Sequence, residues 1–227
     1  MVARGYGMRR RVVVTVALSC LAGSCAAGTP GHETVPGATT PAPAAVPVAS
    51  AGAGWSPAGG LEGPVPAPGT CRAAVSATGA PLPDPSYTPG AIDAAVTQDN
   101  LSVTLCRPGG YTASVRPPER VTRPFKAAAL RAYAERGSMS GYELDHLVPL
   151  EVGGSSDTRN LWPEPDDRPS AGVANSKDPV ESRLHALVCA AVTGGPYLPL
   201  ATAQRLIAAD WSTALARARA ALVGETA

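Results

Sequence analysis

Hydrophobic and polar positions follow a regular period only in the second half of the chain. Residues 91–96 mix apolar and helix-favouring side chains and predict a short helix. Residues 101–105 alternate with period two, which predicts a strand that runs into Cys106. At residues 124–136 Phe125, Ala129 and Tyr133 recur at four-residue spacing, so we expect a helix there with Gly137 as its C-terminal cap.

The next patterned stretch is an apolar strand at residues 142–150, followed by a glycine turn and a second apolar run that opens at Asn160. Residues 178–181 then place an aspartate before a proline, with a glutamate at the third helical position, which is typical of a helix N-terminus. Two more helices are predicted at residues 199–209 and 212–223. This mixture of strands and helices predicts an α+β domain.

Composition separates that domain from what precedes it. The 227 residues include 24 Gly and 24 Pro. Residues 26–84 are rich in Ala, Gly, Pro, Ser, Thr and Val, carry few charges and lack any helix or strand period. Such a composition predicts a flexible, partly polyproline tether. We therefore expect a targeting segment at residues 1–25, a disordered linker at 26–84 and a folded domain at 85–227.

The first 25 residues have the features of an export signal. Arginines at 9–11 precede an apolar run at residues 12–23 that is too short to span a bilayer as a helix. Small residues then lead to Cys25, which resembles the bacterial lipobox, so we expect Cys25 to be lipidated. Cys20 is a second candidate, and an ordinary secretory signal cut just downstream is the alternative. Each interpretation exports the protein, either to the cell envelope on a lipid anchor or as a secreted chain.

Export permits disulfide bonds. Beyond the two cysteines of the signal, the chain has Cys71, Cys106 and Cys189, an odd number that allows one bridge and one free thiol. Cys71 stands at the entry to the domain and Cys106 ends its first predicted strand. We therefore expect a Cys71–Cys106 bridge and a free Cys189, and a Cys106–Cys189 bridge would overturn this assignment.

The formal net charge of +1 provides no global field that favours nucleic acid, so any such binding must come from a local basic face. Arg159, Lys177 and Arg183 are candidate phosphate contacts for such a face. Each of them taken alone could equally be a solvated surface charge.

The most informative motif is Asp145-His146 at the end of an apolar strand, followed by Gly153-Gly154 and then Asn160-Leu161-Trp162. The chain has only 3 histidines, and one stands in this setting. The motif resembles the first half of the HNH endonuclease motif. That resemblance implies a ββα-metal fold, here with additional helices, which hydrolyses phosphodiester bonds with one divalent cation.

By this resemblance His146 matches the general base, Asp145 matches a metal-ligand position, and Asn160 matches the residue that holds the hairpin and orients the base. A histidine suits the first role because its ordinary pKa lies near neutrality. Neighbouring residues on a strand point to opposite faces, so Asp145 and His146 can serve one site only if the strand ends or bends there. Pro149 makes such an ending plausible.

The helix from residue 178 is expected to supply the third element of the motif. Glu181 and His185 are four residues apart, a spacing that lets two side chains reach one cation, as in the colicin-type members of the family. We therefore expect Asp145, Glu181 and His185 to bind Mg²⁺, Mn²⁺ or Zn²⁺. Asp178 is most simply a helix cap, and Glu181 could instead complete its capping box.

Together these features predict a monomeric, exported, metal-dependent endonuclease that cuts DNA or RNA with little sequence specificity. A non-catalytic envelope lipoprotein that keeps the fold as a binding or structural module is the alternative from a different class. A secreted hydrolase of another substrate that uses the same metal site is a third interpretation. The first two differ in their need for divalent metal, which a nuclease requires.

The lipobox-like sequence before Cys25 generates a first prediction. Cys25→Ala should release the protein from the membrane fraction or stall its processing, because the acylated thiol is removed. Mass spectrometry of the mature N-terminus checks this. An unmodified N-terminus downstream of Cys25 in the wild-type protein would contradict it.

Overall fold

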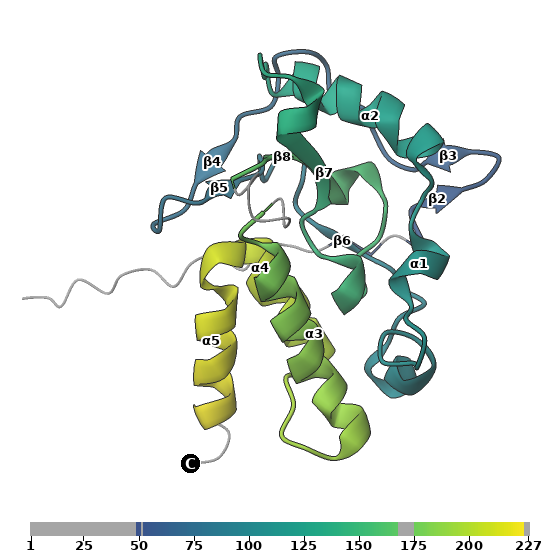
Figure 1. The fold of residues 1–227 in the computed structure, drawn as a ribbon, viewed down its shortest axis with the longest axis vertical. Helices are drawn as coiled ribbons and strands as arrows, with labels where there is room; N and C mark the ends of the chain where they lie inside the picture. The colour runs from purple at the N-terminus through teal and green to yellow at the C-terminus, as the bar shows by residue number, and fades with distance from the viewer. Residues whose placement is uncertain (1–48, 51, 168–174, 225–227) are drawn as a thin grey trace, which may run out of the picture. The chain divides into compact units, whose positions relative to one another are not determined.

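A computed structural model of the protein describes residues 49–50, 52–167 and 175–224 (Figure 1). The expected signal at residues 1–25, with its lipidation site Cys25, lies outside the described residues. In the described ranges, no helix combines the length and apolar character needed to cross a membrane.

The described residues form short two-stranded sheets and several helices, which confirms the α+β prediction at that level. The strands are β1 (Ala49–Ser50), β2 (Trp55–Ser56), β3 (Gly60–Leu61), β4 (Ala74–Val75), β5 (Pro81–Leu82), β6 (Ala91–Ile92), β7 (Tyr142–His146) and β8 (Leu161–Pro165). The α-helices are α1 (Thr112–Val115), α2 (Glu119–Ala132), α3 (Asp178–Thr193), α4 (Leu200–Ala209) and α5 (Trp211–Gly224). Four 3-10 helices complete the order: η1 (Gln98–Val103), η2 (Met139–Gly141), η3 (Leu150–Val152) and η4 (Thr158–Asn160).

The longest sheet is the antiparallel pair β7–β8, in which Asp145 lies opposite Trp162 and His146 opposite Leu161. One side of this hairpin is apolar: Leu161 is buried against Phe125 of α2, and Leu144 packs on the same cluster. The other side carries the acidic residues of β7 and β8, as described below. The hairpin therefore has one face for the core and one for polar chemistry, as alternation along a strand requires.

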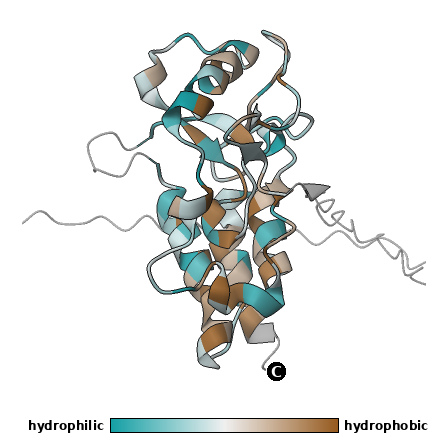
Figure 2. Cartoon of the chain, turned by 90° about the vertical axis from the view of Figure 1, so that its right-hand side faces the viewer, coloured by the Kyte–Doolittle hydropathy of each residue, from teal (hydrophilic) through white to brown (hydrophobic). Residues whose placement is uncertain are grey.

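The main hydrophobic core lies among α3, α4 and α5, the lower helices of Figure 1, where hydrophobic residues are concentrated in Figure 2. Leu184 of α3, Ile207 of α4 and Trp211 of α5 are buried in it. All three helices were predicted from the sequence, α3 from the pattern at residues 178–181 and α4 and α5 from the apolar spacing. Asp210 separates α4 from α5, and its carboxylate accepts a hydrogen bond from the Ser212 amide at 2.9 Å, which caps α5.

The strand predicted at residues 101–105 and the helix predicted at 91–96 are both wrong. The first segment lies in η1 and the turn after it, where the Asn100 side chain accepts from the Thr97 amide and donates to the Ala95 carbonyl. Such local bonds favour a turn over an extended ladder. The second segment begins with β6, which pairs with β1 in parallel. The helix expected to end near residue 136 ends four residues earlier, in α2.

Residues 52–84, which the composition assigned to the tether, pack against the domain instead. The Trp55 indole donates to the Val115 carbonyl at 2.7 Å, and the Cys71 amide donates to the Ala132 carbonyl at 3.0 Å. The Trp211 indole of α5 donates to the Pro81 carbonyl at 2.8 Å. The boundary predicted at residue 85 is therefore too late, because hydrogen bonds from indole and backbone groups hold this segment without any hydrophobic period of its own.

The predicted Cys71–Cys106 bridge is also wrong. Cys106 bonds Cys189 of α3, with their Cα atoms 5.5 Å apart and a sequence separation of 83. Cys71 is a free thiol, 1% exposed, whose backbone lies against the end of α2. The segment that follows η1 packs on α3, so Cys106 meets the helix and not the N-terminal segment.

The long loop closed by this bond generates a second prediction. The double variant Cys106→Ser/Cys189→Ser should lose about 4–5 kcal/mol of unfolding free energy in a chain-entropy model, since a loop of this size gains much freedom when opened. Denaturant unfolding measures the loss. A reductant should lower the Tm of the wild-type protein and of Cys71→Ala alike, and should leave the double variant unchanged. Peptide mapping that joins Cys71 to another cysteine would contradict the assignment.

Candidate functional site

A cavity of about 190 Å³ lies where β7 ends, between the residue after α1, the segment that contains η3, and the start of α3. Asp145 and His146 both line it, although they are neighbours on one strand. Both side chains can reach the cavity because β7 ends at His146. The remaining lining residues are Arg116, Glu143, Pro149, Leu150, Glu151, Asp178, Glu181 and Ser182.

Asp145 is held on two sides. Its Oδ2 accepts a hydrogen bond from the indole nitrogen of Trp162 at 3.0 Å and lies 2.9 Å from the ammonium of Lys177. Trp162 stands opposite Asp145 in the β7–β8 register and is fully buried. Its ring belongs to the core, and its polar nitrogen fixes the carboxylate.

His146 is 7% exposed and has one ring nitrogen, Nε2, 3.0 Å from the hydroxyl of Ser156. Burial lowers the pKa of His146 to about 3, and the positive charges of Arg116 and Lys177 act in the same direction. The imidazole is therefore neutral near pH 7, the form that can accept a proton, although a pKa this far below neutrality makes it a weak acceptor. Ser156, which the sequence analysis did not single out, orients the ring.

Asn160 is fully buried and binds the backbone that surrounds the cavity. Its Oδ1 accepts from the amides of Val148 and Ala91, at 2.9 and 3.2 Å. Its Nδ2 donates to the carbonyls of Val148 and Ser155, at 2.9 and 2.7 Å. Asn160 thus ties the start of β8 to the loop after His146, so it is a positioning residue for the hairpin and the base.

Lys177 was a candidate surface contact for phosphate, but the structure buries it completely. Its ammonium donates to the carboxylates of Asp145 and Glu181 and, at 2.8 Å, to the carbonyl of His146. Burial alone would lower the pKa of Lys177, but the neighbouring carboxylates outweigh it and raise the pKa above its ordinary value. Lys177 is therefore a charged ammonium inside the site and is not available to a substrate on the surface.

Acidic groups outnumber this one buried ammonium. Glu143 and Glu164 face each other across the β7–β8 pair, and burial raises the pKa of both, that of Glu164 to about 10. Burial also raises the pKa of Glu181 to about 7 in spite of Lys177. Glu164 is 2% exposed, and its Oε2 is buried with no hydrogen-bond partner. With a pKa of about 10, Glu164 is a neutral carboxylic acid near pH 7, so Asp145 and Glu181 are the carboxylates that Lys177 pairs.

The capping box predicted for α3 does not form. The N-cap position is Lys177, no side chain caps it, and Asp178 is the first helical residue. Glu181 bonds the Lys177 ammonium instead of the helix terminus. The carboxylate that the pattern assigned to capping is therefore part of the buried charge cluster.

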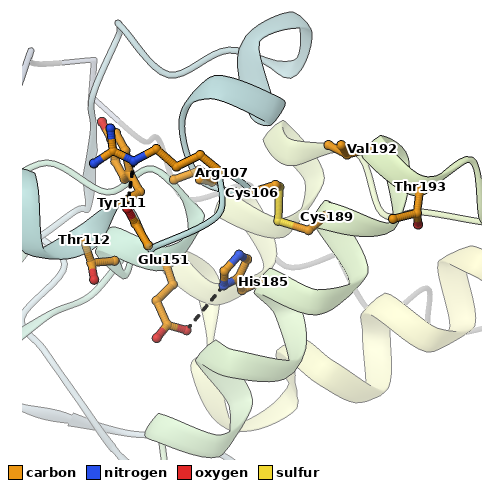
Figure 3. Close-up of a pocket in the computed structure, with 11 residues that line it drawn as sticks. Cys106, Arg107, Tyr111, Thr112, Glu151, His185, Cys189, Val192 and Thr193 are labelled. Carbon is orange, nitrogen blue, oxygen red and sulfur yellow. Dashed lines mark hydrogen bonds and ion pairs between the residues drawn. A yellow bond between two sulfur atoms is a disulfide. The ribbon is translucent and has the colours of Figure 1, made fainter.

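His185 is separated from the other two predicted ligands. It lies in a second cavity, where its Nδ1 is 4.0 Å from Oε2 of Glu151 (Figure 3). In the described residues, the group of three or more His, Cys, Asp or Glu side chains that could hold a metal ion is Cys106, His185 and Cys189, with ligand atoms within 4.8 Å of one another. Its two sulfurs form the disulfide, whereas metal ligation requires thiolates.

The remaining arginines differ in availability. The guanidinium of Arg159 is paired with Asp157 through bonds of 2.9 and 2.8 Å. Arg183 is exposed on α3. Arg116, which the sequence analysis missed, is exposed at the end of α1, lines the cavity and acts electrostatically on His146. The one signal near Arg116 in the sequence is the Pro117-Pro118 pair that follows it, because two prolines restrict the backbone at that position.

Comparison with known proteins adds no relative: no family model, no curated protein and no solved structure matches this chain. Any functional assignment therefore depends on the motif around His146 and on the geometry of the cavity.

The buried ammonium generates a third prediction. Lys177→Met should lower the unfolding free energy by about 3–5 kcal/mol, because it leaves the carboxylates of Asp145 and Glu181 buried without their partner. Chemical denaturation measures this. Arg183→Met, an exposed change on the same helix, is the matched control and should leave stability nearly unchanged. Equal stability of the two variants would show that Lys177 does not hold the cluster.

Proposed function

We propose that this chain is a metal-dependent endonuclease that hydrolyses phosphodiester bonds of DNA or RNA with little sequence specificity. The observation that carries the proposal is the cavity at the end of β7. A neutral histidine, a carboxylate cluster and an unburied arginine converge there. The order β7, β8, α3 around it supports the ββα-metal fold that the HNH resemblance implies.

His146 is the group that activates water in this proposal. Its burial keeps the imidazole neutral, and Ser156 holds one ring nitrogen at 3.0 Å. A neutral imidazole in reach of the cavity can accept a proton from a water molecule that attacks phosphorus. Asn160 keeps the loop after His146 in place, so its contribution is to the position of the base.

The carboxylates fit a hard divalent cation such as Mg²⁺ or Mn²⁺, which prefers oxygen ligands. Asp145 and Glu181 are the residues that would hold it, and both line the cavity together with Glu143 and Asp178. Such an ion supplies charge neutralisation for the phosphate and the leaving oxygen. His185 is not part of this set, because it lies with Glu151 and the disulfide.

Arg116 is the arginine among the residues that line this cavity. It lines the cavity with His146, and its guanidinium is exposed. A guanidinium matches the geometry of phosphate oxygens and stays charged at any relevant pH. In this proposal Arg116 binds the scissile phosphate and places it near the base.

One observation favours the alternative, a non-catalytic envelope module. The ammonium of Lys177 already bonds the carboxylates of Asp145 and Glu181, so the cluster has a cation of its own. A chain that used this fold only for binding or structure would keep the cluster for stability and would not need divalent metal. Metal dependence therefore separates the two functions.

Plasmid nicking by the purified full chain tests the proposal, with Mg²⁺, Mn²⁺, Zn²⁺ or EDTA added. Cleavage should need a divalent ion. His146→Ala should lose about 10²–10⁴-fold in rate while keeping its metal affinity. Asp145→Asn should weaken metal binding, and excess metal should partly restore its rate. Asp99→Asn, an exposed acid on η1, is the matched control and should cut like the wild-type protein.

Two results would contradict the proposal. If the wild-type chain binds divalent metal but never cuts, the non-catalytic function is favoured. If His146→Ala cuts at the full rate, another group is the base, and the Asp145-His146 motif does not define the site.

A further inference from the structure

The second cavity, of about 470 Å³, has no role in the chemistry described so far. Arg107 and Tyr111 line one part of it, and Cys189, Val192 and Thr193 of α3 line another (Figure 3). Glu151 and His185 lie between the two parts in the same view. The volume falls in the range of small-molecule binding pockets.

The walls of this cavity are held in place. The disulfide joins Cys106 to α3. The guanidinium of Arg107 donates to the Gly110 carbonyl at 2.7 Å and to the Ser114 hydroxyl at 2.8 Å, and it lies 5.5 Å from the centre of the Tyr111 ring. Arg107 is thus a planar cation fixed before any ligand arrives, which lowers the entropy cost of binding.

The lining suits a nucleotide. Guanidinium planes and aromatic rings are the surfaces on which unpaired bases stack, and arginine and histidine also attract phosphate. Leu105 and Val192 add apolar surface for a base, whereas Thr112 and Thr193 offer hydroxyls to a sugar. The carboxylate of Glu151 would repel a phosphate: its Oε2 is buried without a hydrogen-bond partner, 4.0 Å from Nδ1 of His185.

The cavity adjoins the catalytic one. Glu151 lines both. The α1 helix begins at Thr112, in the second cavity, and is capped by Arg116, in the first. These four helical residues span about 6 Å, so the two cavities are close enough for one nucleic-acid strand to enter both.

We propose that the cavity beside the disulfide binds the nucleotide next to the scissile phosphate. The base of this nucleotide leaves its neighbours in the strand and stacks on the Arg107–Tyr111 pair. This deepens the proposed function and depends on it for the identity of the substrate. A base that enters the cavity must leave a duplex, so the preferred substrate is a single strand or a single-stranded region.

Binding to a catalytically disabled chain tests the cavity directly. The affinity of the His146→Ala chain for a fluorescent single-stranded oligonucleotide is measured first. Val192→Trp is then added to the same chain as a second substitution, to fill the cavity from its rim, where Val192 is 45% exposed. Loss of one stacked base should weaken binding by about 5- to 100-fold. Val103→Trp, at an exposed valine on η1 outside the cavity, is the matched control and should bind as before.

An oligonucleotide with a run of abasic positions separates stacking from backbone contacts. It should bind the His146→Ala chain more weakly than the normal oligonucleotide, and Val192→Trp should abolish this difference. Arg107→Ala should reduce affinity in the same way, and circular dichroism checks that its loop and disulfide survive. Equal affinity of the Val192→Trp and Val103→Trp chains, or no effect of the abasic positions, overturns the subsite.

Cleavage tests the substrate preference in the active chain. The wild-type protein should cut a single-stranded oligonucleotide with a higher kcat/KM than the blunt duplex of the same sequence, and Val192→Trp should remove that preference. Preferred cleavage of the duplex overturns the proposal. Absence of any cleavage with every divalent ion counts against the nuclease function, whereas the binding experiments still decide whether the cavity takes a base.

Discussion

The buried ammonium of Lys177 is the interaction on which the site depends. It joins the end of β7, through Asp145 and the His146 carbonyl, to the first turn of α3, through Glu181. A charge with no exposed surface persists only when opposite charges and hydrogen bonds surround it. Because those partners come from two elements, the same interaction fixes where the helix begins relative to the hairpin and keeps several acids close together.

Two further constraints hold the surroundings of this cluster. Asn160 binds backbone from the loop after β7 and from β6, so the loop that carries Ser156 stays near the His146 ring. The Cys106–Cys189 bond ties α3 to the segment that follows η1. One cavity therefore has walls set by charge and hydrogen bonds, and its neighbour has walls set by a covalent bond. A rigid frame of this kind favours binding and catalysis, because little ordering remains to be done when a substrate arrives.

The motif residues and the helices were within reach of the sequence because their signals are local. The pattern at residues 178–181 predicts the start of α3, and apolar spacing predicts α4 and α5, since burial of one helix face requires that period. The Asp145-His146 pair, the glycine turn and Asn160 form a short pattern, and the structure places Asp145 and His146 on one cavity, with Asn160 bonded to the loop beside it. The errors are also local in origin: an alternating run at residues 101–105 predicted a strand, whereas the Asn100 side chain stabilises a turn.

The sequence by itself determined that an acid and a histidine end one strand, that a helix follows, and which residue types are available for chemistry. Only the tertiary structure decided how they are combined. It buries Lys177 among carboxylates, moves His185 away to Glu151, brings Arg116 to the cavity and pairs Cys106 with Cys189. These outcomes depend on contacts between segments far apart in the chain, and neither hydrophobic period nor residue spacing carries information about which distant side chains meet.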